Sequence, residues 1–325
     1  MPKADPRQAS AAVLMIRPAS FGFNAETAST NAFQRDGLAL DSEQVHARAL
    51  AEFDAFARKL QARGVSVTVF DDTVEPQTPD AVFPGNWISF HRDGTAIIYR
   101  MLAESRRREV RYDIVDALRD THGFELERII DRSTPPAGMG TLEGTGSLVL
   151  DRIHRVAYAC LSARTDAHAV SEFGRVRGYD TVRFNAADSE GNSVYHTDVL
   201  MTLGDRFAVV CLEAIRDESE RETVRARLAA TEREIVEISI AQMLEFAGNM
   251  LQLTNAAGDS LLAVSARAHA ALSAGQRTRL ESFCEFVVAP LPTIEDYGGG
   301  SARCMLAEIF CRKRDGGTAY GNDTA

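Results

Sequence analysis

A cysteine that follows a run of three glycines has the clearest chemical potential in this sequence. Residues 298–305 read Gly-Gly-Gly-Ser-Ala-Arg-Cys-Met, which places Arg303 beside Cys304. Glycines let the backbone adopt positive φ and approach a ligand closely. A cysteine attacks as its thiolate, the form that nearby positive charge or hydrogen bonds favour. The alternative is a flexible loop that leads into a buried structural cysteine.

A histidine and two carboxylates could complete a set of nucleophile, base and orienting group. Residues 195–199 read Tyr-His-Thr-Asp-Val, so in a strand His196 and Asp198 would share one face. Glu143 follows Leu142 and precedes a glycine-rich turn, where it could hold the His196 imidazole in the correct tautomer. The alternatives are a structural histidine and an exposed acid in a tight turn.

Two further segments carry polar residues of catalytic type at the ends of apolar strands. Residues 80–87 contain Asp80, Phe83 and Asn86, and residues 246–250 contain Asn249. Because the segments come from different repeats, we expect their strand ends to point at a common axis. The chain has no HExxH motif, Cys-x-x-Cys pair or calcium loop, so we predict no metal and no cofactor. The arginines at 106–108 predict a solvated helix face.

The hydrophobic pattern predicts helices alternating with short strands. Apolar residues recur at helical spacing over residues 43–63, 104–122, 165–177, 217–230 and 273–284. Strand-like runs cover residues 65–70, 96–99, 146–150, 156–160, 207–211 and 286–288, with a hairpin turn at 91–94.

Each helix arrives with about three strands, five times over. One such unit cannot bury its own sheet face, but five in a ring can. We therefore predict an α/β fold in one closed catalytic domain, residues 1–325, with flexible tails at about 1–10 and 313–325. A doubly wound parallel sheet is the competing architecture, and the hairpin-like strand pairs count against it.

The composition of the chain limits the classes of partner that we expect it to bind. A net charge of −10 disfavours nucleic acid and an anionic membrane surface. Five cysteines without close pairing predict free thiols in the cytoplasm. The sequence leaves open whether the chain forms a homodimer.

Taken together, the motifs resemble the pentein superfamily, the five-bladed pseudo-symmetric α/β propellers that modify guanidino and ureido groups. The resemblance rests on the order Asp/Asn, Glu, His-x-Asp, Cys along the chain and covers nearly all of it up to Cys311. The opening pattern, Ile16-Arg17-Pro18 with Phe21 and Asn24, is similar to that of bacterial citrulline-utilisation hydrolases.

The resemblance implies a role for each motif. Cys304 resembles the nucleophile, His196 the general acid/base and Glu143 its partner. Asp198 resembles the carboxylate that grips the substrate's terminal nitrogens, and Phe83 an aromatic lying against the planar group. The remaining expected substrate contacts are Asp80, Asn86, Arg17, Phe21, Asn24, Asn249 and Arg303.

One departure from the arginine deiminase pattern suggests the substrate. The first motif reads Asp80-x-x-Phe83-x-x-Asn86, so an amide stands where a second gripping carboxylate is expected. A ureido group is neutral and offers a carbonyl oxygen, to which an amide can donate. We therefore expect hydrolysis of a small amino acid, citrulline, to ornithine, ammonia and carbon dioxide. Arginine deiminase, arginine dihydrolase and dimethylargininase activities are the alternatives, followed by an amidinotransferase and a non-catalytic binding propeller.

Overall fold

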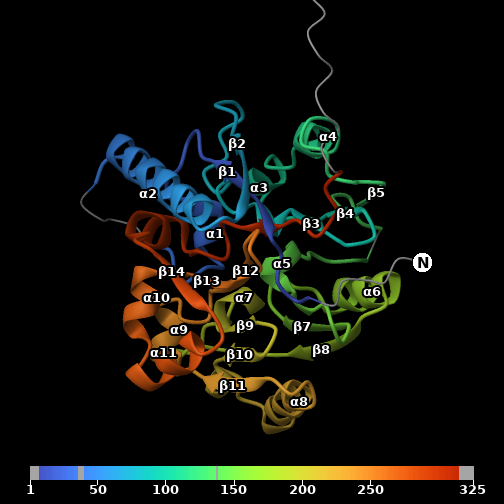
Figure 1. Ribbon diagram of the computed structural model, residues 1–325, viewed down its shortest axis with the longest axis vertical. Helices are drawn as coiled ribbons and strands as arrows, with labels where there is room; N and C mark the ends of the chain where they lie inside the picture. The colour runs from blue at the N-terminus through green and yellow to red at the C-terminus, as the bar shows by residue number, and fades with distance from the viewer. Residues whose placement is uncertain (1–6, 36–39, 137, 315–325) are drawn as a thin grey trace, which may run out of the picture.

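The computed structural model describes residues 7–35, 40–136 and 138–314. In these residues five three-stranded sheets follow one another around the middle of the molecule in chain order (Figure 1). Their strand orders are β15-β1-β2, β3-β4-β5, β6-β7-β8, β11-β10-β9 and β12-β13-β14. The fold is therefore a mixed α/β fold built from five small sheets.

The strands are β1 (Ala12–Arg17), β2 (Ser66–Asp71), β3 (Ile88–Phe90), β4 (Thr95–Ile98), β5 (Arg128–Asp131), β6 (Val149–Asp151), β7 (Val156–Cys160), β8 (Asp180–Phe184), β9 (Met201–Leu203), β10 (Phe207–Val210), β11 (Glu234–Glu237), β12 (Leu251–Thr254), β13 (Ser260–Ser265), β14 (Glu285–Ala289) and β15 (Ala307–Glu308). The α-helices are α1 (Ala25–Ala28), α2 (Ser42–Ala62), α3 (Glu104–Arg107), α4 (Tyr112–Asp120), α5 (Gly144–Ser147), α6 (Ala167–Arg177), α7 (Thr197–Leu200), α8 (Glu218–Ala229), α9 (Ile240–Leu244), α10 (Ala266–Ala271) and α11 (Ala274–Glu281). Two 3₁₀ turns, η1 (Pro84–Asn86) and η2 (Leu212–Ala214), and a π-helix, η3 (Ile294–Gly298), complete the described elements.

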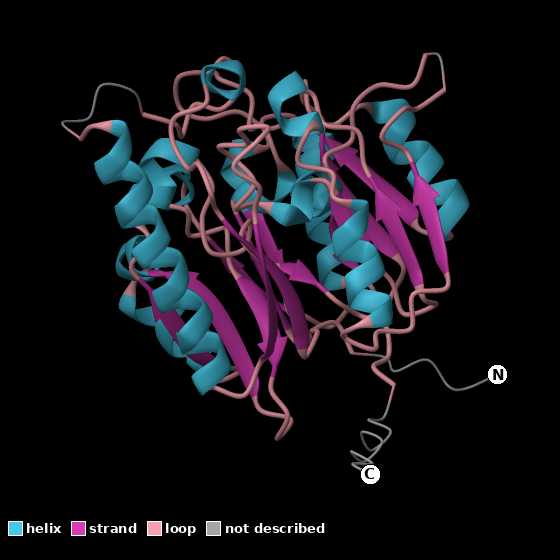
Figure 2. Cartoon of the chain, turned by 90° about the horizontal axis from the view of Figure 1, so that it is seen from above, coloured by secondary structure: helices cyan, strands magenta, loops and turns pink. Residues whose placement is uncertain are grey.

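Each sheet repeats one pattern. An antiparallel pair is followed by a parallel strand, and the parallel strand is reached through a helical crossover, as in β6, β7, α6 and β8. In the first sheet the antiparallel partner of β1 is β15, near the other end of the chain. The larger crossover helices lie at the periphery, while the short α1, α5 and α7 lie near the middle (Figure 1), and helices flank the sheets when seen from above (Figure 2).

Local sequence explains these elements. Helix α2 begins with a capping box between Asp41 and Gln44, and it buries the apolar stripe that includes Phe53 and Phe56. Middle strands such as β7, which reads Val-Ala-Tyr-Ala-Cys, are buried at every position. A strand covered on both faces needs a continuous apolar run rather than an alternating one.

The sequence-based boundaries need three corrections. The helix expected at 104–122 is two helices, α3 and α4, because Arg106 turns inward and Arg107 donates to the carbonyls of Met101 and Leu102. The strand expected from residue 146 begins at Val149, because residues 144–147 form α5. Residues 7–10 of the expected N-terminal tail are placed, and Ser10 is buried and donates to Ile309. Of the expected tails, residues 1–6 and 315–325 lie outside the described residues, whereas Lys313 pairs with Phe124.

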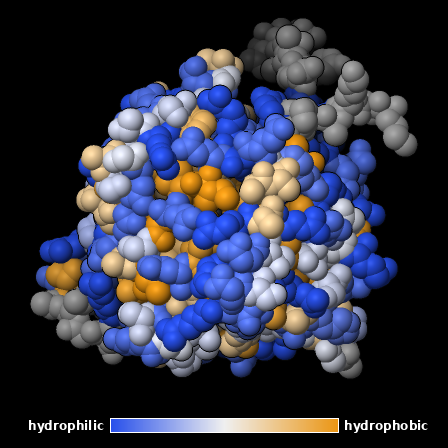
Figure 3. Space-filling model, turned by 90° about the horizontal axis from the view of Figure 1, so that it is seen from below, coloured by the Kyte–Doolittle hydropathy of each residue, from blue (hydrophilic) through white to orange (hydrophobic). Residues whose placement is uncertain are grey.

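The surface drawn in Figure 3 is mainly polar, with apolar side chains gathered in smaller patches between the polar ones. Among the described residues, no helix is both long and apolar enough to cross a membrane. The five cysteines are buried and none forms a disulfide in the described chain.

Candidate active site

The predicted site residues precede the first strand of successive sheets. Asn86 ends the turn before β3, and Glu143 and His196 are the N-cap residues of α5 and α7, which lead into β6 and β9. Asn249 directly precedes the β12 region, and Cys304 lies just before β15. The expectation that His196 and Asp198 share a strand face is wrong, because residues 197–200 form α7.

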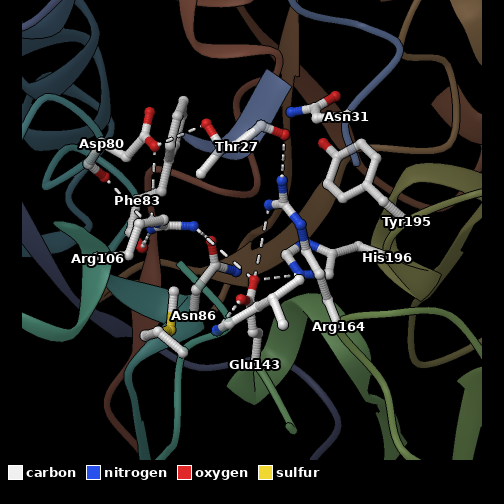
Figure 4. Close-up of polar contacts among 12 residues, drawn as sticks. Thr27, Asn31, Asp80, Phe83, Asn86, Arg106, Glu143, Arg164, Tyr195 and His196 are labelled. Atoms are coloured by element: carbon white, nitrogen blue, oxygen red, sulfur yellow. Dashed lines mark hydrogen bonds and ion pairs between the residues drawn. The ribbon is translucent and has the colours of Figure 1, made fainter. Parts of the chain in front are cut away.

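These turns enclose a cavity with about 260 Å³ not filled by atoms. Five predicted residues line it, namely Asp80, Phe83, Asn86, His196 and Cys304. The glycines at 298–300, which the sequence suggested could approach a ligand, also line it. The lining residues that the sequence did not suggest are Thr27, Asn31, Arg106, Arg164 and Tyr195 (Figure 4). The cavity thus combines a thiol, an imidazole, two guanidinium groups, a carboxylate and two aromatic rings.

His196 and Glu143 form a buried pair. The distance between His196 Nε2 and Glu143 Oε2 is 2.8 Å, and each side chain is nearly inaccessible to solvent. Burial tends to raise the pKa of Glu143, but Arg164 and His196 outweigh it and lower this pKa to about 2. Glu143 also accepts a hydrogen bond from the backbone N–H of Leu102. An ionised, anchored carboxylate on Nε2 leaves Nδ1 as the nitrogen available to a reactant.

Gly146 in α5 allows the side chains of Asn86 and His196 to approach this helix closely. A Cβ at this position would lie 2.4 Å from Asn86 Nδ2 and 2.7 Å from His196 Nδ1. Any side chain would therefore push the amide and the imidazole away from α5. The glycine-rich turn after Glu143 thus serves close packing of the site.

Cys304 lies between a donor and a carboxylate. Asn249 Nδ2 donates to Cys304 Sγ at 3.2 Å, and Cys304 Sγ donates to Asp198 Oδ2 at 3.4 Å. Burial raises the pKa of the Cys304 thiol, the Asp198 carboxylate raises it further, and the Asn249 hydrogen bond opposes both. The cysteine is therefore held as a thiol until positive charge or a base arrives.

Arg106 is buried and contacts several site residues, so the prediction of a solvated arginine face is wrong for this residue. Its Nε and Nη2 form a bidentate pair with Glu109, and its Nη1 donates to Asn86 Oδ1 at 2.9 Å. Because a guanidinium only donates, the Asn86 amide must turn its Oδ1 to Arg106 and keep its Nδ2 donors for other partners. The i,i+3 spacing of Arg106 and Glu109 on a helical segment was the signal in the sequence.

Arg164 and Asp80 face each other across α1. Arg164 donates to the Thr27 carbonyl and to Thr30, and its Nη1 lies 3.7 Å from Glu143 Oε2. Asp80 Oδ2 accepts from Asn24 and Thr27, and burial raises the pKa of this carboxyl. Asp80 Oδ1 and Asp198 Oδ1 are buried without a hydrogen-bond partner among the described residues. Nothing near Arg164 in the sequence indicated this role, because Thr30 and Thr27 lie 134 and 137 residues away along the chain.

The remaining predicted residues have distinct places. Asn24 donates a hydrogen bond to Asp80, which lines the cavity, and Phe21 packs near Gly298. Arg303 lines a different cavity, with its Nε 3.9 Å from Asp198. Arg17 is half-exposed and pairs with Asp54, and it does not line the cavity. Its expected contact with substrate therefore has no support in the structure. In the described parts of the chain no group of three or more His, Cys, Asp or Glu side chains could hold a metal ion.

Comparison with known proteins links this geometry to a group of enzymes. Residues 17–311 match the family described as N,N dimethylarginine dimethylhydrolase, eukaryotic. No curated protein matches the chain in sequence.

Solved structures of similar fold come from related enzymes. One is a substrate-bound mutant of the N-terminal domain of ArgZ, an arginine dihydrolase from cyanobacteria. The match covers 92% of this chain and 99% of the ArgZ domain, with a TM-score of 0.68 and 17% identity. AgrE in complex with ornithine and NAD+ matches 94% of this chain with a TM-score of 0.70 and 17% identity, over 40% of its own length. A mutant dimethylarginine dimethylaminohydrolase carrying an S-methyl-L-thiocitrulline adduct matches 92% of this chain over 99% of its own, with a TM-score of 0.62 and 18% identity. The chain spans 40% of the full-length ArgZ chain.

Proposed function

The chain belongs to the N,N dimethylarginine dimethylhydrolase family, and on that premise we propose that it hydrolyses a C–N bond of a guanidino or ureido amino acid through a covalent bond to Cys304. It is thus a hydrolase of the guanidino-modifying pentein superfamily. The observation that carries the covalent route is the cavity shared by Cys304 and His196, with Glu143 on the imidazole.

We also propose that the five sheets form a closed five-bladed propeller in one catalytic domain. Two features support this arrangement: one strand pattern recurs five times, and β15 pairs with β1 to join distant parts of the chain. A closed ring would bring the turn before each first strand to one axis.

In the proposed reaction the Cys304 thiol gives its proton to the His196 imidazole as Sγ bonds to the central carbon of the planar group. His196 gives a proton to the departing nitrogen as its C–N bond breaks, which leaves an S-linked intermediate. The same imidazole then takes a proton from water, the water oxygen bonds to the carbon, and the S–C bond breaks. Asp198 and Asn86 lie where they could hold the planar group, and Arg164 Nη1 offers donors for the substrate's α-carboxylate.

Asn86 supports citrulline as the substrate. Its Oδ1 is occupied by Arg106, so the group it can offer is the Nδ2 donor. A donor suits the carbonyl oxygen of a ureido group and opposes the N–H groups of a guanidinium. Hydrolysis of the S-linked intermediate would leave a carbamate, which loses carbon dioxide, so the products would be ornithine, ammonia and carbon dioxide.

Arginine is the second candidate, and the carboxylates support it. Asp80 and Asp198 each keep one buried oxygen without a partner, which matches the N–H donors of a cationic guanidinium. Such a cation beside Asp198 would also offset the carboxylate that raises the Cys304 pKa. Deiminase, dihydrolase and methylarginine activities all belong to this alternative. The cytoplasm is the location we propose, on the five unpaired cysteines.

Product analysis separates these substrates. The purified protein is incubated with citrulline, arginine or dimethylarginine, and ornithine, citrulline and ammonia are measured separately. Ornithine from citrulline supports the first assignment, and turnover of arginine alone supports the second. Cys304→Ala should lose at least about 10³-fold in kcat, whereas Cys284→Ala, which removes a buried thiol outside the cavity, should retain activity. Substantial turnover by the Cys304 variant excludes the covalent route.

A further inference from the structure

A second cavity lies outside the candidate active site, between the sheet of β4 and β5 and the helix α6. Both elements lie on the same side of the molecule in Figure 1. About 450 Å³ of space is not filled by atoms there, and part of this space is open to solvent. Its walls are mainly apolar and include Ile97, Ile130, Leu142, Ala169 and Phe173.

Its lining holds three arginines, Arg100, Arg132 and Arg177, against one carboxylate, Glu172. Arg100 has no hydrogen bond or ion pair with any described residue. Arg177 is buried; its Nη2 pairs with Asp93 at 2.9 Å, but its Nε has no partner within the described chain. Arg132 reaches Glu172 at 3.5 Å, and Glu172 is also held by Arg175. The cavity therefore has apolar walls and a surplus of positive charge.

We propose that this cavity binds a small carboxylic acid with an apolar chain or ring. The carboxylate would pair with the Arg100 guanidinium, which has no ion pair with any described residue. The apolar part would lie against Leu142 and Phe173. A phosphate ester or sugar would leave its polar groups against this apolar wall, and an amine would meet the arginines unfavourably.

Two segments of the cavity wall continue along the chain to residues that hold Glu143. Leu142 lines the cavity and precedes Glu143, and the strand that carries Ile97 leads through Arg100 to Leu102, whose N–H donates to Glu143 Oε1. Occupancy would therefore contact both chain segments that hold the carboxylate. On the proposed function, we expect the bound acid to change the turnover rate.

Calorimetric titration of the whole protein with octanoate tests the binding site, and 1-octanol serves as the uncharged control. Octanoate should bind more tightly than octanol. Arg100→Gln should weaken octanoate roughly fivefold and leave octanol unchanged. Arg108→Gln, which removes an exposed arginine outside the cavity, is the matched control and should change neither.

Ala169→Met, which fills the cavity from α6, should weaken both ligands, and a melting curve shows whether the variant is folded. Absent octanoate binding, or equal binding in wild type, Arg100→Gln and folded Ala169→Met, would overturn the site. These titrations contain no substrate, so their outcome does not depend on the proposed activity. Turnover unchanged at saturating octanoate would overturn the link to Glu143 alone.

Discussion

The sulfur of Cys304 receives a hydrogen bond from Asn249, so we expect this amide to act on the nucleophile, beside its predicted contact with substrate. Asn249 Nδ2 also donates to the carbonyl of Asp198, while its Oδ1 accepts from the N–H of Arg303. Asn249→Asp should raise the Cys304 pKa, because it replaces the donor with a second carboxylate. We expect kcat to fall roughly tenfold to a hundredfold, with KM little changed.

The pH dependence of iodoacetamide alkylation of the free enzyme checks the predicted rise in the Cys304 pKa. Asn249→Ala is the control variant, because it removes the donor without adding charge. The alkylation profile should move to higher pH, and further for Asp than for Ala. An unchanged profile together with a raised KM would leave Asn249 with the substrate contact alone.

Glu143 gives the site a specific acid sensitivity. Its pKa is lowered to about 2 in the folded protein, from an ordinary value of 4.5. A depressed carboxyl pKa stabilises the fold above the unfolded value, and this contribution is lost as pH falls from about 4.5 towards 2. Glu143→Gln leaves Arg164 without its carboxylate, so it should destabilise the protein by about 3 kcal/mol at pH 7.

Urea unfolding midpoints of wild type and Glu143→Gln are measured at pH 7, 4.5 and 3. The difference in stability between the two proteins should shrink only at the lowest pH. The same substitution should reduce kcat by roughly 10²–10⁴-fold, because the imidazole loses its orienting partner. A difference that stays constant down to pH 3 would contradict the ionised state of the pair.

The sequence indicated cavity residues where their neighbours in sequence carried the information. Cys304 follows three glycines and Asn86 belongs to a short motif, and both line the cavity. Arg164 was missed because its partners, Thr27 and Thr30, are distant in the chain. Arg106 was misjudged because a run of arginines on a helix is usually solvated, and only the folded chain distinguishes its inward-facing member.

At the scale of elements, the loop that carries Cys304 depends on one left-handed residue. Gly299 ends η3 with φ of +63°, and its carbonyl accepts from the Tyr195 hydroxyl. A Cβ there would lie 2.5 Å from Asn31 Nδ2. Gly299→Ala should therefore incur about 1–2 kcal/mol of backbone strain and also displace the loop, which lowers kcat.

Gly258→Ala is the matched control, because Gly258 also has positive φ but an added Cβ would meet nothing within 4 Å. Both variants should lower the melting temperature, and only Gly299→Ala should reduce kcat by more than a few fold. Equal kcat in the two variants would show that the loop tolerates the displacement.

Periodicity located the elements better than it located their ends. Helix α2 and strand β7 follow directly from an apolar stripe and an apolar run, and the turn at 91–94 joins β3 to β4 as expected. The short helices α5 and α7 have no periodic signal, because four residues make hardly one turn. These are the elements that carry Glu143 and His196, so the geometry of the pair could not be derived from the sequence pattern.

At the scale of the whole molecule, two strands that are far apart along the chain, β1 and β15, meet next to the site. Strand β15 pairs with β1, the N–H of Ile309 donates to Ala12, and the Ile309 side chain packs in the cluster that contains Leu14 and Trp87. Cys304 lies a few residues before this joint. Loosening the joint should therefore affect stability and catalysis together, although no atom of Ile309 lines the cavity.

Ile309→Ala should cost about 2–4 kcal/mol, because the side chain is buried. Urea unfolding followed by the fluorescence of Trp87, the only tryptophan of the chain, and by residual activity should show both midpoints shifting by the same amount. Ile129→Ala, at an exposed position of β5, should shift neither by more than about 0.5 kcal/mol. If activity were lost well before the fluorescence change in Ile309→Ala, the C-terminal segment would separate on its own, and the five sheets would not unfold as one unit.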